Sequence, residues 1–328
     1  MTKILVSALL SLIVATHAFA EDAKMVKIDG SSTVYPITEA MAEEFQTQNK
    51  GKIKVTAGMS GTGGGFKKFC RNEIDISAAS RPITTAEVES CTKAGIKFME
   101  LPVAFDATVI VVHPSNKLTE IKVEDLKKMW EPTAQGTVMK WNQVNPTWPA
   151  TDLKLYGAGA DSGTFDYFTE AIVGKAKSSR GDYTATEDDN VIVKGVAGDK
   201  GALGFLPMSY YMENKTKLKA LAVINGTSKG VLPSKETVEN ATYAPLSRPL
   251  FIYVNAESSK REEIKSFVKM YLTQAKTIVP QVKYVALPPK AYELALEHFN
   301  NAKLGTVFKG HSEIGLTIEQ LLKKEATF

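Results

Sequence analysis

The sequence predicts an α/β protein with two domains. Short apolar segments alternate with amphipathic helical patterns along the whole chain of 328 residues, as is typical of α/β architectures. Removal of an N-terminal signal would leave about 300 residues, which is more than one hydrophobic core usually organises. No low-complexity linker or internal repeat divides these residues, so we expect ordered strands to connect the two domains.

Residues 1–20 have the pattern of a secretory signal peptide. A single early lysine precedes the apolar run 4–14, and Ala18-Phe19-Ala20 provides an A-x-A cleavage site before Glu21. No later segment reaches the roughly 18 unbroken apolar residues of a spanning helix, and no cysteine follows the signal to carry a lipid. We therefore expect a periplasmic protein without a lipid anchor.

The charge balance argues against nucleic acid as a partner. The net charge is +4, and removal of the signal takes away one lysine, which leaves about +3. The basic residues are scattered and carry no interleaved aromatic side chains, unlike a nucleic-acid-binding surface.

The two cysteines, Cys70 and Cys91, predict a disulfide, because an even count in an oxidising compartment usually means a bridge. A metal or redox pair is less favoured, since there is neither a C-x-x-C spacing nor a neighbouring histidine.

In the first part of the chain, three short strands are each followed by a helical pattern. Ile37, Met41 and Phe45 mark the apolar face of the first helix, and Thr84 with Glu87 forms a capping box at the start of the third. The predicted strands are 26–29, 53–57 and 74–78, and the second helix is expected over residues 65–73.

Two longer apolar runs predict strands that cross between the domains. LPVAFDATVIVVHP (101–114) would leave the first domain and APLSRPLFIYVN (244–255) would return to it. A second α/β unit lies between them, with a strand at 153–156 and a helix that ends near Gly174. Helices near 260–277 and 289–296 would complete the first domain.

Four strand-to-helix junctions share one pattern that points to an anion. GSSTVYP, GMSGTGGG, AASRPIT and DSGTFDY each place Ser, Thr or Gly where a helix begins, with free N–H groups and a positive dipole end. One such junction is ordinary capping, but four of them, three with glycine, favour a shared anion site. Arg81 adds a planar cation that can bind an oxyanion or form a salt bridge.

Enzymatic motifs that could use the same residues are missing. Gly65 is followed by Phe66, so there is no Walker A sequence, and neither Ser60 nor Ser162 lies in a G-x-S-x-G elbow. The histidines of the mature chain show no metal-ligand spacing. The sequence therefore predicts no enzyme, no metal and no cofactor.

Taken together and in order, these stretches resemble the PstS family of periplasmic phosphate-binding proteins of ABC transporters, over about residues 25–325. The resemblance implies a type II periplasmic binding protein fold, with two α/β lobes joined by two crossing strands and a ligand cleft between them. The implied division is a signal peptide at 1–20, lobe I at 21–108 and 247–328, and lobe II at 109–246.

The resemblance also implies a set of phosphate ligands, carried over position by position. They are Ser32 and Thr33 from the first loop, Ser60, Gly61 and Thr62 from the second, Arg81 from the third, and Ser162, Gly163 and Thr164 from lobe II. Asp161 is expected to brace the arginine.

One departure from the family pattern concerns the proton of bound phosphate. The best-known members carry an aspartate after the serine of the third loop, where it accepts this proton and repels sulfate, but here Ser80 is followed by Arg81. The arginine that those members carry before the D-x-S-G-T stretch also has no counterpart. We expect Arg81 to supply the cation and regard Asp161 as the candidate acceptor.

The predicted function is capture of inorganic phosphate by a monomer that delivers it to ABC transporter permease subunits in the inner membrane. One alternative is a binding protein for another tetrahedral oxyanion, such as sulfate or arsenate. Others are a secreted phosphatase that uses Ser60 or Ser162 as nucleophile and an extracellular adhesion or scaffold protein.

Overall fold

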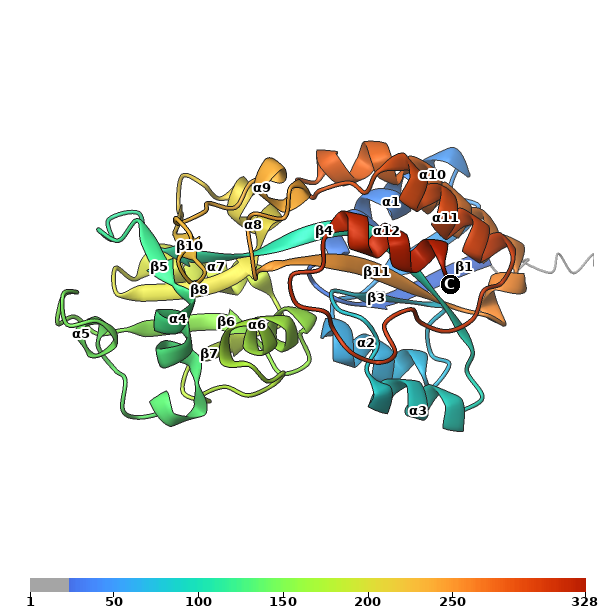
Figure 1. Ribbon diagram of the computed structural model, residues 1–328. Helices are drawn as coiled ribbons and strands as arrows, with labels where there is room; N and C mark the ends of the chain where they lie inside the picture. The colour runs from blue at the N-terminus through green and yellow to red at the C-terminus, as the bar shows by residue number, and fades with distance from the viewer. Residues whose placement is uncertain (1–23) are drawn as a thin grey trace, which may run out of the picture.

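The computed structural model describes residues 24–328, so the predicted signal peptide lies outside the described residues. One mixed sheet of nine strands runs through the molecule in the order β2-β1-β3-β11-β4-β8-β6-β7, with β9 paired to β4. Helices cover both faces of this sheet, and the molecule has two lobes (Figure 1).

Lobe I contains both ends of the described chain. Its elements are β1 (Lys24–Gly30), α1 (Tyr35–Gln48), β2 (Ile53–Ala57), α2 (Gly61–Phe69), β3 (Ile76–Ala79), α3 (Thr85–Lys93), η2 (Ser258–Lys260), α10 (Glu262–Gln281), α11 (Pro289–Asn300) and α12 (Ile318–Ala326). β1 pairs in parallel with β2 and β3, so these three strands end at the same edge of the sheet.

Lobe II repeats the arrangement on a smaller scale. Its elements are β5 (Glu120–Lys122), α4 (Val123–Trp130), η1 (Pro132–Ala134), α5 (Trp141–Val144), β6 (Lys154–Ala158), α6 (Gly163–Val173), β7 (Thr184–Thr186), α7 (Asp189–Gly198), β8 (Ala202–Pro207), α8 (Met208–Glu213), β9 (Lys219–Ala220), β10 (Ala222–Ile224) and α9 (Lys235–Glu239). β6 lies between β7 and β8 and is parallel to both.

Two long strands connect the lobes, as the apolar runs predicted. β4 (Phe98–Val112) is buried along its whole length, and so is β11 (Ser247–Asn255). β4 pairs with β11 as far as Ala107 and with β8 from Thr108 onward. The same strand therefore belongs to the sheets of both lobes, and it passes through the middle of Figure 1 next to β11. We propose that lobe I comprises residues 21–108 and 247–328 and that lobe II comprises residues 109–246.

The main difference from the predicted elements concerns the glycine run. α2 begins at Gly61, earlier than the predicted residue 65, so most of the glycines lie inside the helix. Gly61 has a φ of +77°, and a Cβ there would lie 2.4 Å from the carbonyl oxygen of Asp161 in lobe II. Gly61 is therefore a glycine because the other lobe approaches the start of this helix closely, whereas a Cβ at Gly65 would lie 2.6 Å from Gly30 Cα at the end of β1, within lobe I. The C-terminal helix α12 was not predicted from the sequence.

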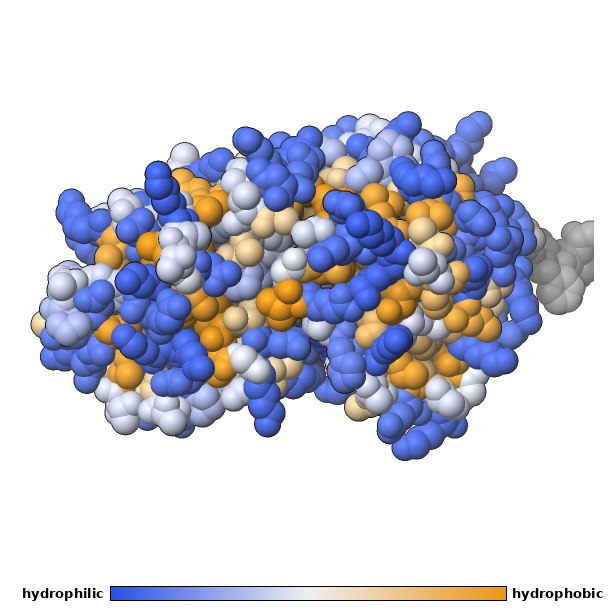
Figure 2. All heavy atoms as spheres, in the orientation of Figure 1, coloured by the Kyte–Doolittle hydropathy of each residue, from blue (hydrophilic) through white to orange (hydrophobic). Residues whose placement is uncertain are grey.

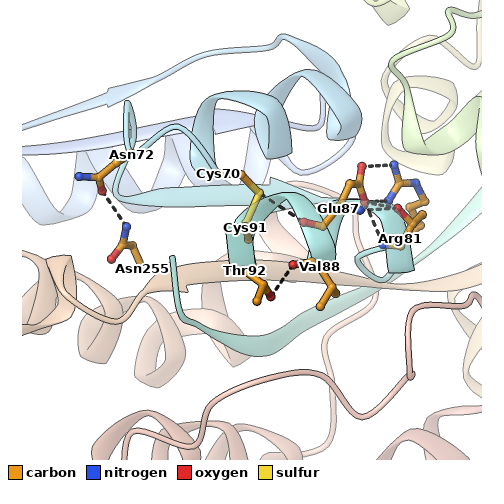
Figure 3. Close-up of a disulfide and its surroundings, with 9 residues drawn as sticks. Cys70, Asn72, Arg81, Glu87, Val88, Cys91, Thr92 and Asn255 are labelled. Atoms are coloured by element: carbon orange, nitrogen blue, oxygen red, sulfur yellow. Dashed lines mark hydrogen bonds and ion pairs between the residues drawn. A yellow bond between two sulfur atoms is a disulfide. The ribbon is translucent and has the colours of Figure 1, made fainter. Parts of the chain in front are cut away.

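The predicted disulfide is confirmed. Cys70, which caps the C-terminal end of α2, is bonded to Cys91 in α3 (Figure 3). The capping box of Thr84 and Glu87 at the start of α3 is also present. Together, these two features fix α3 against α2.

The visible surface is mostly hydrophilic, with apolar side chains in separate groups (Figure 2). Within residues 24–328, no helix is long and apolar enough to cross a membrane.

Candidate functional site: the cleft between the lobes

The four junctions singled out in the sequence meet where the two lobes face each other. Three of them follow β1, β2 and β3, whose ends share one edge of the lobe I sheet, and the fourth follows β6 of lobe II. The first direct contact joins the hydroxyls of Thr33 and Thr164, whose Oγ1 atoms are 2.9 Å apart. A second joins the lobes through the backbone, where Gly63 N–H donates to the carbonyl of Asp161 at 2.8 Å.

Gly163 allows the two lobes to approach this closely. It is the first residue of α6, and a Cβ at this position would lie 2.5 Å from both Ser80 Oγ and Thr62 Oγ1. These two hydroxyls are 3.2 Å apart, and Thr62 Oγ1 also accepts a hydrogen bond from the N–H of Ser80. Any larger residue at position 163 would clash with the loops of lobe I.

Several backbone amides at these junctions remain free to bind an anion. Among the described residues, the junction N–H groups that donate to no other part of the chain include those of Ser32, Thr33, Gly61, Thr62 and Gly163. They belong to helix starts and to the loop before α1, where unpaired amides and the helix dipole favour negative charge. The arrangement suits a small anion held by neutral donors.

Arg81 is buried and bridges the lobes through two carboxylates. Its Nε donates to Asp166 Oδ2 of lobe II at 2.6 Å. Its two Nη atoms donate to the Glu87 carboxylate at 2.8 Å each, as Figure 3 shows. A fourth hydrogen bond goes to the carbonyl of Pro82. Burial alone would lower the pKa of Arg81, but Glu87 and Asp166 raise it, so the guanidinium stays charged. One of its five N–H groups remains available.

The expected pairing of Asp161 with Arg81 is not present. Asp161 accepts a hydrogen bond of 2.8 Å from Lys67, and both side chains are largely exposed. Asp166, five residues further along, holds the arginine instead.

Two of the expected serine ligands use their hydroxyls for local structure. Ser60 donates from both its N–H and its Oγ to Asp29 Oδ1. The hydroxyl of Ser162 accepts from the N–H of Thr164 and caps α6. These bonds position both junctions, and the binding roles of the expected ligands stay a prediction.

Arg248 is a further cation in the cleft that we did not single out in the sequence. It lies on β11, is fully buried, and its Nη2 donates to Thr164 Oγ1 at 2.8 Å and to Thr33 Oγ1 at 3.3 Å. Its Nη1 donates to the carbonyl of Gly163. Asp106 on β4 balances its charge at 3.2 Å, and burial raises the pKa of Asp106 despite this arginine. The only signal was a charged residue inside each of the two apolar crossing runs.

Two α/β lobes on crossing strands, with hydroxyls, amides and guanidinium groups facing the cleft between them, define a ligand-binding protein of the two-lobed type. Comparisons with known proteins agree. A model of the PBP superfamily domain matches residues 15–274. Protein SphX of Synechococcus elongatus is 53% identical over 301 residues, which are 92% of this chain and 89% of that protein.

Two further relatives carry phosphate in their names. The phosphate-binding protein PstS of Staphylococcus saprophyticus is 38% identical over 271 residues, 81% of this chain and 82% of that one. The crystal structure of a possible phosphate binding protein from Planctomyces limnophilus is 44% identical, with a TM-score of 0.64, and the match covers 86% of this chain and 99% of that one. The chain belongs to the PstS family within the PBP superfamily, and it has the type II periplasmic binding protein fold.

Proposed function

We propose that this protein captures inorganic phosphate in the cleft between its lobes and delivers it to an ABC transporter. The observation that carries the proposal is the triad of Thr33, Thr164 and Arg248, in which two hydroxyls from opposite lobes meet on one buried guanidinium. The names of the relatives support phosphate as the anion.

In the proposed complex, the anion inserts among groups that contact one another in this structure. The hydroxyls of Thr33 and Thr164 turn from each other to the phosphate oxygens, and the free amides of the junctions add neutral donors. The proposed ligand set is completed by Ser32, Ser60, Gly61, Thr62, Ser162 and Gly163. Arg248 supplies the nearer positive charge, and Arg81 contributes its one remaining N–H.

The same contacts explain why phosphate would favour closure of the two lobes. Thr33 belongs to lobe I and Thr164 to lobe II, so an anion that binds both hydroxyls favours the closed form over an open one. The closed form is then the one that docks on the permease subunits. We further propose that the protein works as a monomer in the periplasm, without a lipid anchor and without enzymatic activity of its own.

A matched pair of threonine variants tests the site. Thr164→Val removes a hydroxyl from the triad, whereas Thr169→Val removes one from the same helix that bonds only to the backbone and to Lys177 N–H. We expect a loss of phosphate affinity of roughly 10-fold or more for Thr164→Val, since hydrogen bonds to charged groups contribute about 1.5–3 kcal/mol. Thr169→Val should keep wild-type affinity. Equal effects of the two variants would contradict the proposed site.

Hydrolysis of a chromogenic phosphate ester tests the enzymatic alternative. The proposal expects no turnover by the wild-type protein. Turnover that is abolished by Ser162→Ala would replace the binding function with a phosphatase.

A further inference from the structure

One carboxylate at the cleft has no partner of opposite charge. Asp189 is the first residue of α7 and follows β7 in lobe II. Its side chain is only 2% exposed, and Oδ2 has no hydrogen-bond partner within residues 24–328. A buried carboxylate oxygen without a donor is costly, so its presence calls for a ligand or a proton.

Asp189 lies against the first anion-binding loop. The side chain of Ser32, next to Thr33, lies near enough to lower the pKa of Asp189. The hydroxyl of Tyr210 on α8 donates to the carbonyl of Ser32 at 3.5 Å and holds this loop from the same side. The carboxylate of Asp189 therefore lies near Ser32, the residue that directly precedes Thr33 of the triad.

Four other acidic groups around the cleft are already neutralised by a cation. The pairs are Asp29 with Lys68, Asp106 with Arg248, Asp161 with Lys67, and Asp166 with Arg81. Within residues 24–328, two other carboxylate oxygens at this edge are buried without a donor, Oδ1 of Asp166 and Oε2 of Glu187. Asp166 already pairs with Arg81 through Oδ2 and has Lys177 at 3.9 Å from Oδ1. Glu187 is only half-buried, and its Oε1 already accepts from the N–H of Asp161.

We propose that Asp189 is the carboxylate that accepts the proton of bound phosphate and thereby excludes sulfate. This inference rests on the proposed phosphate-binding function. At neutral pH, phosphate keeps at least one proton that it can donate, whereas sulfate has none. An ionised Asp189 would gain a hydrogen bond from phosphate and would meet only oxygen lone pairs on sulfate.

The titration of Asp189 agrees with this role. Burial raises the pKa of Asp189 to about 7, although Ser32 and Arg248 act to lower it. Asp106 and Asp188 raise it further. The charged and titratable groups that face Asp189 from neighbouring elements are Arg248 on β11, Asp106 on β4, Tyr210 on α8 and Tyr284 after α10.

The test compares phosphate and sulfate binding to Asp189→Asn, with Glu187→Gln and Asp161→Asn as matched controls. The amide has the size of the carboxylate but offers N–H donors. We expect phosphate affinity to fall roughly 10- to 100-fold in Asp189→Asn while sulfate affinity rises. Both controls should keep the wild-type preference for phosphate. An equal change for both anions in Asp189→Asn, or a switch of preference in Glu187→Gln instead, would overturn the assignment.

A second measurement needs no variant. Sulfate stays unprotonated between roughly pH 5 and pH 9, so any pH dependence of its binding reports the protein. Sulfate should bind the wild-type protein more tightly below a pH of about 7, where Asp189 is protonated, and more weakly above it. Sulfate binding independent of pH would contradict the inference and leave phosphate binding intact. Wild-type protein that binds no phosphate would overturn the proposed function and this inference with it.

Discussion

Asp166 and Glu87 bind the same guanidinium from opposite lobes, and this gives two variants with different expected effects. Asp166→Asn removes the lobe II partner of Arg81, which accepts from Nε at 2.6 Å. Glu87→Gln weakens the two bonds of 2.8 Å that lie within lobe I. The Asp166 contact exists only while the lobes are together, whereas the Glu87 contact persists when they separate.

The expected loss of phosphate affinity follows from the contacts that each variant loses. A charge-assisted hydrogen bond contributes about 1.5–3 kcal/mol. Burial raises the pKa of Asp166, which shows that desolvation opposes part of this gain, so we expect about 1–2 kcal/mol less favourable closure in Asp166→Asn. Because phosphate binds the closed form, this loss appears as roughly 5- to 30-fold weaker affinity.

The assay is calorimetric titration with phosphate, combined with small-angle scattering to follow closure and with chemical unfolding. Asp166→Asn should weaken phosphate binding and increase the radius of gyration of the ligand-free protein in small-angle scattering. The chemical unfolding transition of lobe I should stay unchanged. Glu87→Gln should lower stability more than it lowers affinity. If Glu87→Gln weakened binding more than Asp166→Asn, the assignment of Arg81 as an interlobe bridge would be refuted.

Three further predictions follow from single features. Gly163→Ala should fold normally yet bind phosphate at least 10-fold more weakly, because the added Cβ would meet the lobe I hydroxyls at 2.5 Å only in the closed form; wild-type affinity in a titration would contradict this. Cys70→Ser with Cys91→Ser should lower the free energy of unfolding by about 3 kcal/mol, as measured with denaturant, because a loop spanning 21 positions is no longer closed. Burial raises the pKa of Asp189 from its ordinary value of 3.8 to about 7, so the folded protein binds a proton that the unfolded chain releases. Its contribution to stability is lost as pH rises from about 4 to 7, by up to roughly 4 kcal/mol without ligand, and Asp189→Asn should remove this slope from a denaturation series.

The local signals of the site could be predicted from the sequence because they lie within single short segments. Each junction is predicted by three signals within about seven residues: the end of a strand, a Ser, Thr or Gly residue, and the start of a helix. This prediction does not depend on where the junction lies in the folded protein. The two crossing strands were visible for a similar reason, since a strand buried on both faces is a continuous apolar run.

The side-chain pairings could not be predicted, because they join residues far apart in the chain. Arg248 and Asp106 are 142 residues apart, and Arg81 and Asp166 are 85 apart. Nothing in the sequence near Asp161 distinguishes it from Asp166 as the partner of Arg81. That choice is made by the helical position of Asp166, which turns its carboxylate toward lobe I while Asp161 stays in the exposed loop. That Asp189 lacks a cation partner likewise cannot be read from the sequence, because it depends on which carboxylate each neighbouring Lys or Arg pairs with in the folded protein.

The most direct test of the account is a calorimetric titration of ligand-stripped mature protein with phosphate at neutral pH, with sulfate as competitor. We predict that one phosphate binds per chain, with an affinity that excess sulfate does not reduce. Absence of phosphate binding, or its displacement by sulfate at comparable concentration, would contradict the claim that this cleft is built for phosphate.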